Sequence, residues 1–340
     1  MRVAIAGAGI AGLTAALAFA RQGAEVSVFE KAPALEEVGA GLQLSPNAMH
    51  VLSALGLEDS VMAKGVEPEV ATIRHWKSGR RYFNSPLRGA CRDRYGAPFS
   101  QIHRADLLEL LVDAATAAGA KIRTGTAVEQ YDRTMGVSAT LSDGAAVKAD
   151  LLIGADGIHS AVRTQMLGPE EPVFTGQVAW RALVPVDALP PGLVKPEATV
   201  WAGPGHHVVT YLLRDRTLAN IVAVQERPAW QEESWTIPGD AAALQTAFRD
   251  WHPDVTGLLA RVEQCYLWGL FTRPPLPRWS DGPVVLIGDA CHPTLPFMAQ
   301  GAAMGIEDAG RLAAMVRASD DLAATLIQFK LQREPRTTRL

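Results

Sequence analysis

The sequence predicts an α/β protein whose doubly wound, Rossmann-like domain is divided in the chain by a β-rich segment. Three observations support this fold class. The chain opens with a buried strand, a glycine-rich loop and an apolar helix. A second buried strand, Pro283 to Ile287, comes late in the chain and runs into Gly288 and Asp289. Between them lies a stretch of alternating apolar and polar residues, which is typical of antiparallel strands.

The first thirty residues predict a site for a dinucleotide. The loop GAGIAG follows a strand at residues 2–6 and precedes a helix. We expect Gly7 to permit a tight turn, Gly9 to let a pyrophosphate approach, and Gly12 to let helix and strand pack closely. The phosphates would lie at the helix N-terminus, where free N–H groups and the dipole favour anions. Glu30 ends the second strand, about twenty residues past the glycines, where the fold needs a carboxylate for a ribose hydroxyl. A glycine-rich structural turn is the alternative interpretation.

Composition and charge narrow the class of protein. The chain has 340 residues, of which 48% are hydrophobic and 20% charged, so we expect about two globular domains. The net charge of −4 gives no reason to expect binding to nucleic acid or to an anionic membrane. Three distant cysteines and scattered histidines predict reduced thiols, no metal site and a cytoplasmic location.

No segment is long and apolar enough to span a membrane. The tripeptide Ala18-Phe19-Ala20 resembles a secretory cleavage site, but cleavage there would destroy the glycine loop. We therefore reject a secretory signal.

The expected domains follow from changes in residue composition and hydrophobic pattern along the chain. Residues 1–172 form the first part of the dinucleotide domain, residues 173–266 a β-rich substrate domain, and residues 267–340 the second part with C-terminal helices. A hairpin near residues 70–98 is a possible addition to the substrate domain. Five of the eight tryptophans fall in the β-rich stretch. Its alternating runs are residues 177–185, 198–202, 207–213 and 220–225, followed by one helix at residues 240–251.

Three motifs together resemble one family. They are GAGIAGL…FEK near the start, IGADGIHSAVR in the middle and LIGDACHPTLPFMAQGAAMGIEDA near the end. In this order they resemble the FAD-dependent aromatic-ring hydroxylases, single-component flavin monooxygenases that include salicylate and 3-hydroxybenzoate hydroxylases. The resemblance covers nearly the whole chain.

The resemblance implies an enzyme with FAD as cofactor, NADH or NADPH as a transient co-substrate, and O2. A flavin C4a-hydroperoxide would hydroxylate a phenolic or aromatic acid. No second glycine motif followed by a helix exists for the nicotinamide cofactor, because a strand-like segment follows Gly203-Pro204-Gly205. This agrees with a reductant that binds only briefly.

The resemblance also implies which residues bind FAD. Gly7, Gly9 and Gly12 match the pyrophosphate glycines, and Glu30 with its neighbour Lys31 matches the adenosine-ribose acid. Gln43 falls where relatives contact the flavin, and Asp289 matches the acid that holds the ribityl hydroxyls. The remaining expected cofactor contacts are Arg104 near the pyrophosphate, Val128 at adenine, Asp156 in the middle motif, and the Gly301 and Ala302 backbone near the flavin's pyrimidine edge.

His207 and Tyr211 are the expected catalytic residues. They stand in GPGHHVVTY at an even spacing of four, which places both on one face of a strand and turns His206 the other way. The segment resembles the family strand that lines the pocket over the flavin. The alternative for His207 is a histidine on the sheet surface. His292 is a weaker candidate, and Pro296 stands where some hydroxybenzoate-type relatives carry a polar residue.

Two other functions stay open at this point. One is a flavin epoxidase or hydroxylase of a larger apolar molecule, such as a quinone precursor. The other is a flavin-binding protein without oxygenase turnover, since the chain stops at Leu340, shortly after a helix end that relatives follow with a further segment. The sequence predicts a monomer or a homodimer and does not identify the aromatic substrate.

Overall fold

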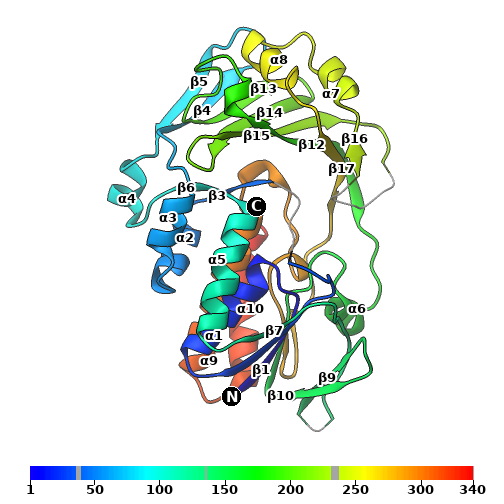
Figure 1. Cartoon of the computed structure of the whole chain (residues 1–340). Coiled ribbons are helices and arrows are strands. Elements are labelled where there is room, and N and C mark those ends of the chain that lie inside the picture. The colour runs from blue at the N-terminus through cyan, green and yellow to red at the C-terminus, as the bar shows by residue number, and fades with distance from the viewer. Residues whose placement is uncertain (36–39, 135, 231–236, 340) are drawn as a thin grey trace.

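The computed structural model describes residues 1–35, 40–134, 136–230 and 237–339. Two large sheets dominate it, one in the lower half of Figure 1 and one in the upper half. The predicted α/β fold with two separated pieces of the dinucleotide-binding part is confirmed, because strands from both ends of the chain share the lower sheet.

The lower sheet has six strands in the order β18-β19-β11-β1-β2-β7. All neighbours are parallel except β18 and β19. The glycine loop follows the central strand β1, so it lies at the carboxyl edge of the sheet, where ligands bind in α/β proteins. The strand bounds are β1 Arg2–Ala6, β2 Glu25–Phe29, β7 Lys121–Arg123, β11 Leu151–Gly154, β18 Ser280–Asp281 and β19 Val284–Leu286.

Helices cover one face of this sheet, and a small antiparallel sheet, β10-β9-β8, lies on the other. Helix α1 is almost wholly apolar and is buried between the sheet and helices α5 and α9. The bounds are α1 Ile10–Arg21, α5 Arg104–Ala117, α9 Gly301–Arg317, α10 Leu322–Thr337, β8 Val128–Asp132, β9 Val137–Leu141 and β10 Ala146–Ala149.

The upper sheet has eight strands in the order β16-β17-β12-β15-β14-β13-β4-β5. Its outer face packs on helices α7 and α8 through Trp180, Val208, Phe248 and Leu258. Its inner face looks toward the lower half. The bounds are β4 Val70–His75, β5 Arg81–Pro86, β12 Val173–Pro185, β13 Ala198–Gly203, β14 His206–Leu213, β15 Leu218–Glu226, β16 Pro238–Gly239, β17 Cys265–Thr272, α7 Ala241–Ala247 and α8 Pro253–Leu259.

Sheet membership differs from the expected division of the chain at the boundary near residue 266 and agrees with the hairpin expected near residues 70–98. Strand β17 continues to Thr272, so the expected boundary at residue 266 falls inside a strand. Hairpin β4–β5 joins the upper sheet, since β4 pairs in parallel with β13. The helix expected at residues 240–251 is shorter, α7 at Ala241–Ala247, and a second helix, α8, begins at Pro253 after the cap residue His252.

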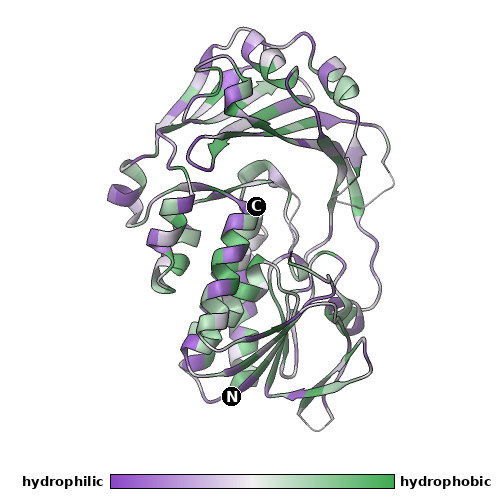
Figure 2. Ribbon diagram, in the orientation of Figure 1, coloured by the Kyte–Doolittle hydropathy of each residue, from purple (hydrophilic) through white to green (hydrophobic). Residues whose placement is uncertain are grey.

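Short elements connect the two halves. Strands β3 and β6 pair with each other beneath the upper sheet. Leu44 and Ile102 from these strands belong to the hydrophobic core of the lower half, and the Gly41 N–H donates a hydrogen bond to the Asn220 side chain on β15. The hydropathy colouring in Figure 2 shows apolar residues concentrated on α1 and on the lower sheet's strands. The bounds are β3 Gly41–Leu44, α2 Pro46–Ala54, α3 Glu58–Lys64, α4 Ala90–Tyr95, β6 Ser100–His103 and α6 Ala161–Leu167.

In the part of the chain that the structure describes, no helix has both the length and the apolarity needed to cross a bilayer.

Candidate active site

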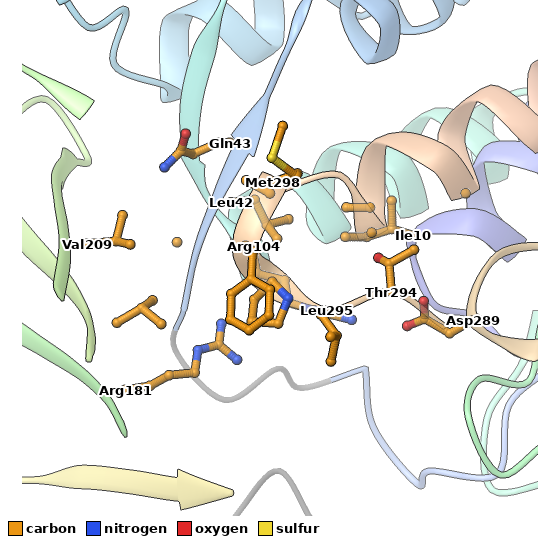
Figure 3. A pocket seen from close by; sticks show the side chains of 18 of the residues that line it. Ile10, Leu42, Gln43, Arg104, Arg181, Val209, Asp289, Thr294, Leu295 and Met298 are labelled. Carbon is orange, nitrogen blue, oxygen red and sulfur yellow. The ribbon is translucent and has the colours of Figure 1, made fainter. Parts of the chain in front are cut away.

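A cavity of about 440 Å³ lies between the two halves of the molecule. One wall comes from the glycine loop, the loop after β19 and the start of α9. The other wall is the inner face of the upper sheet. Figure 3 shows Asp289 and Thr294 on one side of this space and Arg181 and Val209 on the other. Among the expected site residues, those that line the cavity are Gly9, Gln43, Arg104, His207, Tyr211, Asp289, Gly301 and Ala302.

The three loop glycines differ in what surrounds them. Gly7 has a φ of +97°, and a Cβ atom there would lie 2.4 Å from the carbonyl oxygen of Ala155. A Cβ at Gly12 would lie 2.0 Å from the Gly7 carbonyl oxygen, so helix and loop touch there. A Cβ at Gly9 would meet no atom within 4 Å, and Gly9 lines the cavity. The structure therefore keeps open space over Gly9, at the N-terminus of α1.

A second helix N-terminus faces the same cavity. Gly301 and Ala302 begin α9, and the helix has neither a side-chain cap nor an acidic residue in its first turn. The side chain of its N-cap residue, Gln300, bonds instead to Ser45 and Asn47. The positive end of the α9 dipole thus remains available to a negatively charged or hydrogen-bond-accepting group in the cavity.

Several polar side chains in the lining make no hydrogen bond to a residue that the structure describes. The Asp289 carboxylate makes no hydrogen bond to a described residue, and neither does the Gln43 amide. The Thr294 hydroxyl is buried and also unpartnered in the described part of the chain. Burial raises the pKa of Asp289, although the nearby charge of Arg104 opposes the shift. Since buried polar groups normally find partners, these atoms fit a polar ligand such as a polyol chain.

Besides Gly7 and Gly12, four expected cofactor residues lie outside the cavity lining. The Glu30 carboxylate accepts hydrogen bonds from the backbone N–H of Ala8 at 2.8 Å and of Ala32 at 2.9 Å, which ties it to the glycine loop. Lys31 is exposed and Val128 is buried in β8.

The fourth residue, Asp156, accepts hydrogen bonds from groups at the start of helix α6. Its carboxylate accepts from the Ser160 hydroxyl at 2.5 Å and from the Val162 N–H at 3.2 Å. Burial raises the pKa of this carboxyl group. Its neighbour Gly157, which belongs to the same middle motif, lines the cavity instead.

His207 projects from β14 into the cavity. Val209 and Tyr211 line the cavity beside it, whereas His206 packs on the other face against Phe248, with ring centroids 5.5 Å apart. Burial, followed by the neighbouring His206, lowers the pKa of His207. No hydrogen bond joins the His207 ring to another described residue. The ring is therefore neutral at neutral pH and has a nitrogen available to accept a proton.

Tyr211 is fixed by close packing. Its ring is 3% exposed and lies against strand β3, where a Cβ at Gly41 would be 2.5 Å from Cε2 of the tyrosine. Its hydroxyl has no hydrogen-bond partner among the described residues. Burial raises the pKa of this hydroxyl, so it stays protonated and can donate a hydrogen bond.

Sequence reasoning missed two residues of the sheet wall. Arg181 on β12 and Trp268 on β17 both line the cavity, and the guanidinium carbon lies 4.8 Å from the centroid of the tryptophan ring. The alternation of residues 177–185 could have placed Arg181 on one face of a strand. It could not have shown which face meets the cavity.

His292 has a structural position rather than a catalytic one. Its Nε2 lies 2.5 Å from an oxygen of Asp308, whose other oxygen accepts from Arg333 at 2.6 Å. Burial disfavours the charged imidazole, but Asp308 outweighs it and the pKa of His292 is raised. This buried network joins the loop that carries Asp289 to helices α9 and α10. No cluster of possible metal ligands occurs among the residues described.

Comparisons with known proteins agree with this geometry. The family model described as "FAD binding domain" matches residues 1–325. The 3-amino-4-hydroxybenzoate 2-monooxygenase PtmB3 of Streptomyces platensis is 37% identical, covering 98% of this chain and 84% of that protein. The 3-hydroxybenzoate 6-hydroxylase 1 of Aquipseudomonas alcaligenes is 37% identical, covering 99% and 86%.

Two solved structures are similar along the whole chain. HpxO of Klebsiella pneumoniae, crystallised with FAD and uric acid, has a TM-score of 0.86 and 29% identity, covering 99% of this chain and 85% of that one. A salicylate hydroxylase substrate complex has a TM-score of 0.85 and 27% identity, covering 100% and 86%.

Proposed function

The chain belongs to the FAD-dependent aromatic-ring hydroxylases, and we propose that it hydroxylates a phenolic aromatic acid in the cavity between its two halves. The observation that carries this proposal is that two chemically different walls face each other across the cavity. Backbone N–H groups and polar side chains that bond to no described residue lie across one cavity from His207 and Tyr211. The names of the relatives describe rings that carry a hydroxyl group, several of them with a carboxylate.

The cofactor wall fits FAD. Open space over Gly9 would take the pyrophosphate, and Asp289 with Thr294 would bind ribityl hydroxyls. Gly301 and Ala302 would hold the pyrimidine edge at the positive end of α9. The chemistry that FAD would supply is the reduction of O2 with electrons from NADH or NADPH and the transfer of one oxygen atom to the ring.

His207 is the proposed base for the phenol. Its pKa is lowered by burial, so a ring nitrogen is free at neutral pH to accept the phenolic proton. Removal of that proton makes the aromatic ring more electron-rich and a better nucleophile. Burial raises the pKa of Tyr211, so its hydroxyl stays protonated. It would donate a hydrogen bond from Oη to the phenolic oxygen and so fix the position of the substrate ring.

The rest of the sheet wall excludes water. Val200, Val209, Val222 and Val224 line the cavity beside the two polar groups. Apolar side chains at this position favour a planar hydrocarbon ring over solvent. They also keep the reactive centre dry, which reduces loss of reducing equivalents as free peroxide.

The test is a panel of aromatic compounds in which NAD(P)H oxidation and hydroxylated product are measured separately. Stimulated oxidation with matching product from a hydroxybenzoate or hydroxypyridine acid supports the proposal. Turnover only on prenylated rings would favour a quinone-precursor hydroxylase. Bound flavin with no stimulation by any compound would overturn the proposal and leave a flavin-binding protein without turnover.

Three finer points stay predictions. The cytoplasmic location rests on the three cysteines, which are free and buried. We propose a monomer or a homodimer, whereas one similar structure is described as the tetrameric form of an oxygenase. The assignments of Glu30, Lys31, Val128 and Asp156 to FAD also remain proposals.

A further inference from the structure

The sheet wall of the cavity has a charge at one position only within the described residues. Arg181, Val222, Val209 and Val200 are direct register partners on β12, β15, β14 and β13, and all four line the cavity. The row thus runs from one cation to three valines. His207 stands one row away on β14, as the register partner of Val224.

The spacing of the row suits a substrate with two functional groups. Strands β12 and β14 are separated by β15, so their backbones are roughly 10 Å apart. A ring lying on the valines, with its hydroxyl at His207, would extend toward β12. Arg181 is long enough to meet a substituent on the far side of that ring.

Trp268 holds the arginine in a defined orientation. The indole is 4% exposed, and the guanidinium carbon lies 4.8 Å from its centroid. A guanidinium stacked on an aromatic face keeps its N–H groups in the plane, where a carboxylate can accept two of them. In Figure 3 Arg181 extends from the sheet into the cavity, on the side opposite Asp289.

The other arginine of the lining has a different place. Arg104 begins helix α5, and its charge acts on Asp289. It therefore belongs to the proposed cofactor wall. Arg181 is the cation of the sheet wall.

We propose that Arg181 binds the carboxylate of the aromatic substrate and makes the enzyme select acids over neutral phenols. This inference rests on the proposed function, since it assigns the carboxylate end of a ring whose hydroxyl lies at His207. It assigns Arg181 a role in specificity, whereas His207 keeps the role of base.

The test compares two matched pairs of probes, 3-hydroxybenzoate with phenol and 6-hydroxynicotinate with 2-hydroxypyridine. Binding is measured by the change in the absorbance of enzyme-bound flavin, and hydroxylated product is measured in parallel. We expect Arg181→Gln to weaken binding of the better-bound acid by about 10- to 100-fold. Binding of its neutral partner should change less than about threefold. Arg181→Lys, which keeps the charge but lacks the planar fork, should give an intermediate loss.

Arg227→Gln is the matched control, because Arg227 stacks on Trp180 of the same sheet but does not line the cavity. It should leave both members of each pair unchanged. Equal losses for the acid and the neutral compound in Arg181→Gln, or no loss for either acid, would overturn the inference. If Arg181→Gln loses flavin or does not fold, the acid-to-neutral ratio in Arg181→Lys decides, and an unchanged ratio rejects the proposal.

Failure of this inference differs from failure of the proposed function. Coupled hydroxylation of a neutral phenol, with no preference for acids, would keep the function and remove the role of Arg181. Binding of acids that depends on Arg181, without any hydroxylated product, would do the reverse.

Discussion

The two walls of the cavity recognise their ligands in different ways. The wall of the lower half presents main-chain groups at Gly9, Gly301 and Ala302, fixed by glycine packing and by a buried charge network. The wall of the upper sheet presents side chains, His207 and Tyr211 among valines. The first wall can vary little without losing its backbone geometry. The second can change its ligand by exchanging one side chain, which explains how relatives with this fold carry the names of different ring hydroxylases.

The largest loss of stability should come from adding a methyl group in the glycine loop. Gly12→Ala places Cβ 2.0 Å from the Gly7 carbonyl oxygen, a clash with main chain that should cost about 3 kcal/mol or more. Gly9→Ala, where Cβ meets nothing within 4 Å, should fold normally and bind FAD more weakly. Thermal unfolding without added FAD and flavin titration separate the two. Equal loss of stability in both variants would contradict the separate roles of these glycines.

The next effect tests the support behind the cofactor wall. Arg333→Met leaves Asp308, which is fully buried, without its arginine, and should destabilise the protein by about 3–5 kcal/mol. Arg311→Met is the control, because the exposed Arg311 bonds to Gln332 on the same pair of helices and should cost less than about 1 kcal/mol. Denaturant unfolding measures both. A loss for Arg333→Met no larger than for the control would show that the network does not support the loop.

A smaller effect is expected on the sheet wall. His207→Ala should lower product formation by about 10²-fold, leave FAD binding nearly unchanged and release peroxide. In the parent protein the pKa of His207 lies below its usual 6.5, so product per NAD(P)H should be level at neutral pH and fall only as acid protonates the ring. His206→Ala is the control, since His206 faces Phe248. Normal coupling in His207→Ala would place the base elsewhere.

The smallest effect concerns Tyr211. Tyr211→Phe removes one hydrogen bond and keeps the ring that packs on Gly41. We expect KM for the substrate to rise about 3- to 10-fold, with little change in kcat. Steady-state kinetics with the best acid provide the measurement. A large fall in maximal rate instead would assign the proton transfer to Tyr211.

The difference between the walls also decided what the sequence could predict. Gly7 and Gly12 could be predicted because only glycine accepts the positive φ of the first and the close main-chain contact of the second. Gly9 has neither constraint and was predicted from its place in the motif. Alternation along β14 placed His207 and Tyr211 on one face. Arg181 was missed because its neighbours in space, Trp268 and Val222, come from strands whose order depends on the whole sheet. The boundary at residue 266 was misplaced in β17 for the same reason, since sheet pairing and not composition determines where that strand ends.

The most direct test of the account is a crystal structure of the protein with FAD and the acid that it hydroxylates. We predict the isoalloxazine against Gly301 and Ala302, the ribityl chain at Asp289, and the substrate ring on the valines of the upper sheet. The phenolic oxygen should lie within hydrogen-bonding distance of a ring nitrogen of His207. An acid bound away from the sheet, or in the sheet cavity with its hydroxyl turned away from His207, would contradict the division of the cavity into a cofactor wall and a substrate wall.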